Sequence, residues 1–353
     1  MASLSDLADR VLRGLLALPG VVVSAFDGEV RVPDTLPPGE VEERVRATAV
    51  HPEALLALED DLHHVLHDGR VLAWQHRGRT AFAVGGLNAP PGAKAALLDA
   101  YASTCAARGV RRQLVFPVRA DELEEARSAG FAPVQVGVEA WVDLPGLTLR
   151  GRRFENLRQM RNRARRRGLV VEEAAPAAVE AELSAMHAAW LAAKRPSWRM
   201  KLLVGSPAFS RPAGRRYLVA RGPGRAEAFV TLLPGAPGTW GVDVMCRWPD
   251  AVPGAMELLL AHAVAQLRDE GARALSLGAC PMAGVPFDPR RPVLTAIFRL
   301  LYGTWLGNRV FGFRNLVRFK DKLAPRWEPV HFAARPGLGA WALYQGCRMW
   351  GLY

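Results

Sequence analysis

The sequence predicts a mixed α/β protein, of the α+β kind with a mixed sheet, built from two tandem domains of similar plan. Short apolar runs typical of strands alternate along the chain with stretches in which apolar residues return every three or four positions, as in amphipathic helices. Both halves show the same order of elements: a strand meander, a helix, a strand, a helix and a strand. This order favours a sheet with helices on its faces. The 353 residues suffice for two ordinary domains, which we place at residues 1–148 and 149–353.

The first half begins with an amphipathic pattern over residues 4–18, which predicts an opening helix. A proline-rich stretch ends that pattern, and a second helix is predicted from Gly39. The other elements predicted in this half are strands at 71–74 and 80–84 joined as a hairpin, a helix at 94–107, a strand at 112–118, a helix at 121–129 and a strand at 134–144.

The second half opens with the densest charge run in the chain, residues 150–167, which holds nine arginines and one acid. Four apolar residues recur within it at helical spacing, so we predict a linker helix that docks through this stripe. A run of one sign without acidic partners repels itself unless an anion lies nearby, which favours an anion-binding surface over a solvated face. The other elements predicted are a helix at 177–194, strands at 217–220, 226–233 and 239–245, a helix at 255–268, a strand at 274–277 and a helix at 294–305.

Composition narrows the partners and the compartment. The net charge of +12 favours a polyanionic partner, either nucleic acid or an anionic membrane surface. The four cysteines are scattered without a C-x-x-C pair, so neither a zinc site nor a disulfide framework is indicated and a cytoplasmic location is expected. No signal peptide and no apolar run long enough to span a membrane is found. His63, His64 and His67 lie close together, but we predict a polar helix face rather than a metal site, since no further ligand cluster stands nearby.

The order of strand, turn and helix around residue 250 is also that of the acyltransferase fold that binds acetyl-coenzyme A. That fold seats a pyrophosphate on backbone N–H groups of a glycine-rich loop at a helix N-terminus. The corresponding loop here, residues 247–254, has two prolines, an acid and one glycine. We therefore expect no acetyl-coenzyme A binding. No G-x-S-x-G, H-E-x-x-H or P-loop motif occurs either.

Several short segments occur in an order that is informative as a set. They are Gly130-Phe131, residues 136–144, Leu157-Arg158 with Arg161-Asn162-Arg163-Ala164 and Gly168, Trp190, Asp243-x-Met245, Pro253-Gly254-x-Met256, Leu277-Gly278-x-x-Pro281, and Phe319-Lys320-x-Lys322 with Pro325-x-Trp327-Glu328-Pro329. Together they resemble the catalytic domain of the phosphatidylglycerol lysyltransferase family, also called multiple peptide resistance factor. The resemblance covers nearly the whole chain and implies two tandem acyltransferase-like (GNAT-like) domains. Its members move an aminoacyl group from a charged tRNA onto a lipid headgroup.

Two departures from the family pattern bear on the acceptor. The family usually reads Asp-Leu-Met-Arg, and a gapless match puts Cys246 on that arginine. Arg247 is one residue further on and, in a strand, points to the opposite face unless a local bulge restores it. The sequence also shows no counterpart of the family's N-terminal membrane domain, which flips the lipid product.

The resemblance implies roles for individual residues. Asp243 would bind the aminoacyl ammonium or act as base, Lys320 would hold the phosphate or oxyanion, and Glu328 would orient Lys320 or the substrate amine. Against these roles stand a strand-end cap for Asp243 and a solvated basic turn for Lys320. Further substrate contacts are expected from Met245, Cys246, Arg247, Gly278, Arg314 and Lys322, and tRNA contacts from Arg158, Arg161, Arg163, Arg165 and Arg166. No cofactor or metal is expected, because the aminoacyl-tRNA co-substrate is already activated.

Three functions follow as alternatives. The first is aminoacylation of the phosphatidylglycerol hydroxyl, with the chain peripheral on the inner face of the plasma membrane. Residues 294–318 and the C-terminus, which mix aromatic residues with arginines, would then contact the anionic lipid surface. The second keeps the tRNA donor but uses a small soluble hydroxyl or amine acceptor. The third is a non-catalytic RNA- or membrane-binding module.

Overall fold

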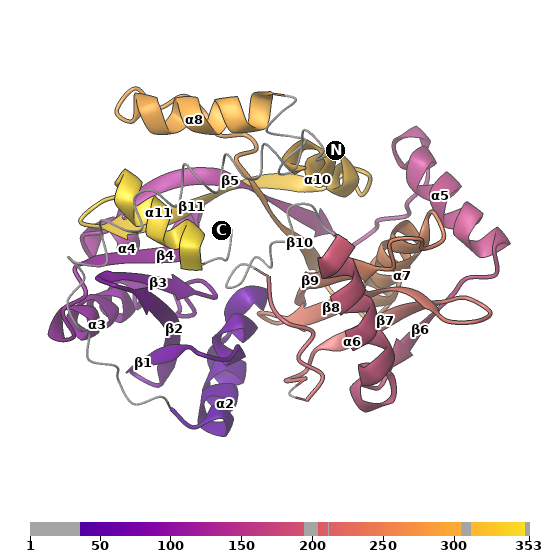
Figure 1. Ribbon diagram of the computed structural model, residues 1–353, viewed down its shortest axis with the longest axis horizontal. Helices are drawn as coiled ribbons and strands as arrows, with labels where there is room; N and C mark the ends of the chain where they lie inside the picture. Colours follow the sequence, from indigo (N-terminus) through magenta and orange to yellow (C-terminus); the bar gives the residue numbers. More distant parts are fainter. Residues whose placement is uncertain (1–35, 194–203, 211, 305–311, 350–353) are drawn as a thin grey trace, which may run out of the picture.

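The computed structural model describes residues 36–193, 204–210, 212–304 and 312–349, and its described strands form a single mixed sheet with helices on both faces (Figure 1). The helix predicted at 4–18 lies outside the described residues. Most other predicted elements are confirmed, several to within a residue or two.

The first half contributes five strands. In chain order its elements are α2 (Pro38–Thr48), η1 (Pro52–Leu58), β1 (His63–His67), β2 (Arg70–Arg77), β3 (Thr80–Val84), α3 (Lys94–Ala107), β4 (Arg112–Arg119), η2 (Ala120–Glu122), α4 (Leu123–Ser128) and β5 (Ala132–Asp143). The predicted hairpin is confirmed, because β2 pairs antiparallel with β3. The prediction of a polar helix face at residues 63–67 is wrong, because this segment is strand β1 and pairs along its length with β2.

The second half contributes six strands. Its elements are η3 (Arg152–Phe154), α5 (Glu155–Arg166), β6 (Val170–Ala174), α6 (Pro176–Ala193), β7 (Arg216–Arg221), β8 (Ala226–Pro234), β9 (Thr239–Arg247), α7 (Ala255–Asp269), β10 (Ala274–Pro281), α8 (Pro292–Gly303), α10 (Phe313–Asp321), β11 (Arg326–Arg335) and α11 (Ala340–Met349). The alternative of a solvated basic turn for Lys320 is wrong, since Lys320 is a buried residue of α10.

The strand order is β1-β2-β3-β4-β11-β5-β10-β9-β8-β7-β6. The pairs β3–β4 and β9–β10 are parallel, and every other neighbouring pair is antiparallel. The last strand of the chain, β11, therefore lies between two strands of the first half. The division at residues 148 and 149 stays a prediction about independent domains, whereas the described sheet is continuous across it.

Both faces of the sheet are covered because alternate residues of each strand point to opposite sides. In β8, Val230 and Leu232 pack in the cluster beneath α5 and α7. Phe229 packs beneath α6, and Leu233 packs in the cluster that contains η1 and α2. Because Phe229 and Leu233 share one face of β8, α6 and η1 cover the same side of the sheet.

The linker helix α5 packs on α7 through its buried Leu157 and Ala164. The contact requires a glycine, because a Cβ at Gly254 would overlap the Met160 carbonyl oxygen. Gly254 also has a φ of +95° as it leads into α7, a conformation that costs glycine little. The apolar stripe of the arginine run is thus turned inward, and the arginines are left on the outer side.

Candidate active site between the two halves

The parallel strands β9 and β10 pair over three residues only and then separate. Ala274, Leu275 and Ser276 pair with Thr239, Trp240 and Gly241. Beyond Gly241, a bulge at residues 243–244 interrupts the pairing of β9 with β8. Asp243 lies two residues past Gly241 and Gly278 two residues past Ser276, so both follow directly where the strands part.

Lys320 reaches this separation from α10. Lys320 is 3% exposed, and its Nζ donates to the carbonyl oxygens of Gly278 at 2.9 Å and Ala279 at 3.0 Å. Burial lowers the pKa of Lys320, against the opposing effects of Cys280 and Glu139. The amine therefore ties α10 to the end of β10 rather than standing in solvent.

Asp243 is held by a loop that crosses in front of β9. Its Oδ1 accepts a hydrogen bond from the Gly205 N–H at 2.8 Å, and a Cβ at position 205 would overlap Oδ2. The Oδ2 atom is buried without a hydrogen-bond partner in the described part of the chain. Burial raises the pKa of Asp243 to about 6, against the lowering effect of Arg215. A carboxylate with a pKa near neutrality and one free oxygen is suited to accept a proton.

Both halves of the chain contribute to the surroundings of Asp243. A cavity of about 60 Å³ is lined by residues 58–60 from the end of η1 and by Ser206, Ala208, Ser210 and Arg215. Glu59 accepts hydrogen bonds from the Ser206 N–H and Oγ at 2.8 and 3.0 Å. The first half thus fixes the loop that holds Asp243.

A buried ionic network joins η1 to strands at the middle of the sheet. Arg119, at the end of β4, donates from Nε and Nη2 to both oxygens of Glu139 on β5 at 3.0 and 3.1 Å. Its Nη2 also donates to Glu53 of η1 at 2.9 Å. Ser276 of β10 donates to Glu139 at 2.6 Å and accepts the Gly278 N–H at 2.9 Å. The network links η1, β4, β5 and β10 at the point where the halves meet.

The two carboxylates of the network respond differently to burial. Burial raises the pKa of Glu139, and Arg119 opposes this only in part. The pKa of Glu53 is lowered, since Arg119 and His51 outweigh the effect of burial. Glu53 also raises the pKa values of both Asp243 and Lys320, so the network and the two predicted catalytic residues belong to one electrostatic unit.

Several other residues predicted to touch substrate have partners within the protein. Glu328 of β11 is in register with Glu139 and contacts Arg326. Lys322 pairs with Glu257 at 2.7 Å, and Arg314 donates to the Tyr302 carbonyl at 2.8 Å. Both of these cations are therefore engaged within the protein.

The bulge in β9 leaves Arg247 on the other side of the strand from Cys246. It ends before Met245, and Cys246 and Arg247 pair regularly with Phe229 and Ala228. Cys246 is buried beneath α6, whereas Arg247 is exposed. The bulge therefore does not bring Arg247 to the side of the strand where the family's arginine is expected.

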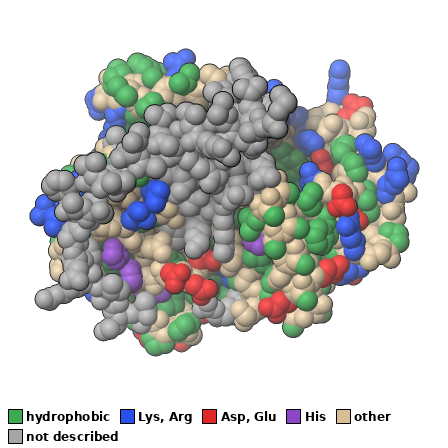
Figure 2. All heavy atoms as spheres, in the orientation of Figure 1, with side chains coloured by type: hydrophobic (Ala, Val, Ile, Leu, Met, Phe, Trp, Pro, Cys, Tyr) green, Lys and Arg blue, Asp and Glu red, His purple; other side chains and the backbone are tan. Residues whose placement is uncertain are grey.

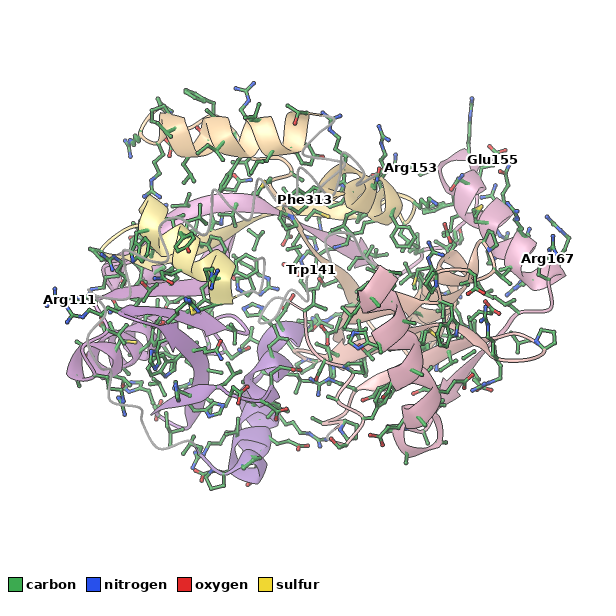
Figure 3. The ribbon with its side chains drawn as sticks, in the orientation of Figure 1. Arg111, Trp141, Arg153, Glu155, Arg167 and Phe313 are labelled. Carbon is green, nitrogen blue, oxygen red and sulfur yellow. The ribbon has the colours of Figure 1, made fainter. Side chains whose placement is uncertain are left out.

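The arginines of α5 lie at the outer edge of the molecule, away from the centre marked by Trp141 (Figure 3). Arg163, Arg165 and Arg166 are exposed. Arg158 donates to the carbonyls of Leu149 and Gly151, so it holds the segment that leads into α5. Burial, with Arg165 and Arg158, lowers the pKa of Arg161, which reflects the repulsion expected of a one-sign surface.

Sequence reasoning missed Glu53, Arg119, Glu139 and Ser276 as members of the site. A signal was present, because Arg119 ends a strongly apolar strand segment and Glu139 interrupts another. A charged residue in a buried strand is rare unless it is paired. The pairing itself joins residues 20 to 137 positions apart and has no local pattern.

Comparison with known families decides the affiliation. The family model described as phosphatidylglycerol lysyltransferase, C-terminal, matches residues 43–334. The chain belongs to this family. The phosphatidylglycerol lysyltransferase of Bacillus subtilis (strain 168) is 25% identical over 229 residues, which are 63% of this chain and 26% of that protein. The chain thus matches about a quarter of the length of that relative.

Solved structures show that the fold is shared. A C-terminal domain of a putative lysylphosphatidylglycerol synthetase from Agrobacterium fabrum superposes with a TM-score of 0.73 at 23% identity, covering 90% of this chain and 96% of that one. The L-PGS structure from Bacillus licheniformis gives 0.72 at 18% identity, covering 91% and 99%. FemX gives 0.51 at 10% identity, covering 85% and 96%. The predicted tandem GNAT-like α/β fold is confirmed.

None of the described helices is both long and apolar enough to cross a bilayer. Within the same residues, His, Cys, Asp and Glu form no group of three or more that could hold a metal ion.

Proposed function

We propose that this lysyltransferase-family chain moves an aminoacyl group from a charged tRNA to the hydroxyl of phosphatidylglycerol. The observation that carries the proposal is Asp243, a carboxylate with a raised pKa and a free Oδ2, standing where β9 and β10 separate. Family membership supplies the reaction class, and the buried ionic network supplies a site partly shielded from water.

In the proposed reaction, the acceptor hydroxyl oxygen attacks the carbonyl carbon of the aminoacyl ester. Its proton passes to Asp243, and the carbonyl oxygen becomes an oxyanion. The carbonyl re-forms as the bond to the ribose oxygen breaks, and the ribose oxygen takes up the proton. Lys320 fixes the end of β10 and places positive charge near the developing anion. The ester is already activated, so positioning and proton transfer are the main tasks of the protein.

The arginines of α5 are the proposed tRNA contact. Arg163, Arg165 and Arg166 are exposed, and no ion pair joins them to other residues within the described ranges. A phosphate backbone would relieve their mutual repulsion, and such binding weakens steeply with salt.

Helix α8 is the proposed lipid contact. Its outward side chains Val293, Ile297 and Leu300 are 72%, 45% and 62% exposed, and Phe287 in the preceding loop is 52% exposed. Figure 2 shows hydrophobic and basic side chains together on this helix, at the top of the view. An apolar stripe flanked by arginines suits the boundary of an anionic bilayer.

A small soluble acceptor is the second candidate, and Cys246 favours it. A phosphate-bearing acceptor needs a cation near its phosphate, and the family's arginine position is occupied here by a buried cysteine. An acceptor without phosphate would not require that cation.

The test is an assay with a mixed pool of radiolabelled aminoacyl-tRNAs and phosphatidylglycerol vesicles. Label in the organic phase supports the lipid acceptor and identifies the amino acid. Label lost from tRNA only when soluble hydroxyl or amine compounds are added supports the second candidate. No transfer by folded protein to either class of acceptor contradicts both.

A flotation experiment tests the lipid contact separately. Ile297→Gln with Leu300→Gln should reduce binding to phosphatidylglycerol vesicles. The matched control is Leu66→Gln with Val170→Gln, which alters two exposed apolar side chains elsewhere on the surface. Equal loss in both double variants would argue against α8 as the contact.

A further inference from the structure

Two buried hydrogen-bond donors near the centre of the sheet have no assigned partner. Arg119 is 7% exposed and Trp141 is 8% exposed. The Arg119 Nη1 and the Trp141 Nε1 are both buried without a hydrogen-bond partner among the residues that the structure describes. Buried polar atoms are nearly always paired, so two such donors in one place indicate that a hydrogen-bond acceptor binds there.

The two side chains lie close together, and hydrogen bonds hold the guanidinium in place. The Arg119 Cζ lies 5.8 Å from the centre of the Trp141 ring. Glu139 accepts hydrogen bonds from Nε and Nη2, and Glu53 accepts a further one from Nη2. Nη1 is therefore the guanidinium nitrogen that makes no hydrogen bond within this network. Trp141 is two residues from Glu139 on the same strand and so projects from the same face of β5.

Strand register connects this donor pair to Asp243. Ser276 pairs with Trp141 on one side and with Gly241 on the other. Asp243 follows Gly241 by two residues, just as Glu139 lies two residues from Trp141. A substrate bound across β5, β10 and β9 can therefore contact the donors and the base together.

Charge balance selects the kind of acceptor. Arg119 and Lys320 supply two positive charges, against the carboxylates of Glu53, Glu139 and the base Asp243. With no surplus positive charge, the site gains little by binding a full anion such as a phosphate. A neutral carbonyl oxygen that gains negative charge only during reaction fits the two donors better.

We propose that Arg119 Nη1 and Trp141 Nε1 form the oxyanion hole for the aminoacyl ester carbonyl, an inference that rests on the proposed function. As the acceptor oxygen bonds to the carbonyl carbon, the carbonyl electron pair moves to its oxygen, which receives the two hydrogen bonds. The pair returns when the bond to the ribose oxygen breaks. Glu53 and Glu139 act as positioning residues, because they orient the guanidinium without touching the substrate.

The decisive variant is Trp141→Phe, which keeps the ring and removes the N–H. Trp74→Phe is the matched control, because the Trp74 Nε1 is also buried without a partner in the described residues but lies in the cluster beneath α3. Single-turnover transfer from aminoacyl-tRNA should slow on the order of a hundredfold in Trp141→Phe. The KM for aminoacyl-tRNA should stay within about twofold, and Trp74→Phe should match the wild type.

Each outcome decides the inference. An unchanged rate in Trp141→Phe overturns it, and so does a raised KM with an unchanged rate, which would mean ordinary substrate binding. Arg119→Lys keeps the charge but removes the planar guanidinium and its Nη1 donor. This variant, if it folds, should also lower the rate. If wild-type protein transfers nothing from any aminoacyl-tRNA, the proposed function itself has failed, and that result is distinct from a variant effect.

Discussion

Asp243, the proposed base, has an ionisation that opposes folding. Its carboxylate is buried against Gly205 and has a pKa raised from 3.8 to about 6. Ionisation therefore opposes folding, and the stability of the protein should fall as the pH rises from about 4 through 6 because of this group. Active sites often carry such a cost.

Asp243→Asn should remove this cost while keeping the hydrogen bond from Gly205. Measured by thermal unfolding, the melting temperature of the variant relative to wild type should increase between pH 4.5 and pH 8. Asp269→Asn, which alters an exposed carboxylate, should show no such trend. A relative melting temperature that is constant or falls with pH would contradict a raised pKa at Asp243.

The same pKa predicts the acid limb of activity. In the proposed reaction the ionised carboxylate accepts the proton, so kcat/KM for transfer should decline about tenfold per pH unit below about 6. The proposed tRNA contact on α5 does not involve this carboxylate, so tRNA binding measured in parallel should not follow the same decline. An acid limb centred near 4 would show that an ordinary carboxylate, and not Asp243, limits the reaction.

At this scale the sequence predicted part of the site. Asp243, Lys320 and Glu328 were suggested by family motifs, and their roles stay predictions. Glu53, Arg119 and Trp141 could not be assigned, because their importance lies in contacts between segments far apart in the chain.

Among the elements, α5 presents the clearest test of partner binding. Replacing Arg163, Arg165 and Arg166 by Ala should weaken tRNA affinity and reduce the slope of log affinity against log salt by about two. The matched control replaces the exposed Arg77, Arg111 and Arg127, which changes the net charge equally. If both triple variants lose the same affinity, the effect is one of overall charge and α5 is not the contact surface.

The elements predicted well are those with a strong period of their own. Helix α3 (Lys94–Ala107) covers the predicted range. The bounds of the central strands in each half differ from the predicted bounds by a few residues. The prediction for residues 63–67 is wrong because three histidines in five residues conceal the alternation of a strand. Only the pairing with β2 reveals the strand. The sequence suggests a turn at the end of α10 because Lys320 is polar, whereas its side chain points inward there.

For the whole molecule, the insertion of β11 between β4 and β5 has no local sequence signal. Arg326 at the start of β11 pairs in register with Trp141 and contacts Asp143 at 3.3 Å, so the end of β5 and the start of β11 are neighbours. Without β11, both β4 and β5 expose an unpaired edge, which favours aggregation.

Residues 1–148 alone should therefore not fold cooperatively. A chain in which residue 144 is joined by a short Gly/Ser linker to residues 326–349 should fold better, because it restores β11 as a hairpin with β5. Thermal unfolding followed by circular dichroism compares the two. A sharp transition in the 1–148 fragment would show that the division at 148 marks an autonomous domain.

The central claim is that the centre of this sheet catalyses aminoacyl transfer from tRNA. The most direct measurement is the single-turnover rate at which labelled aminoacyl groups leave tRNA for the acceptor, with wild-type protein and Asp243→Asn side by side. Wild type should transfer the label, and the variant should do so at a rate at least a hundredfold lower, with tRNA affinity unchanged. Equal rates in the two proteins, or no transfer by well-folded wild type, would contradict it.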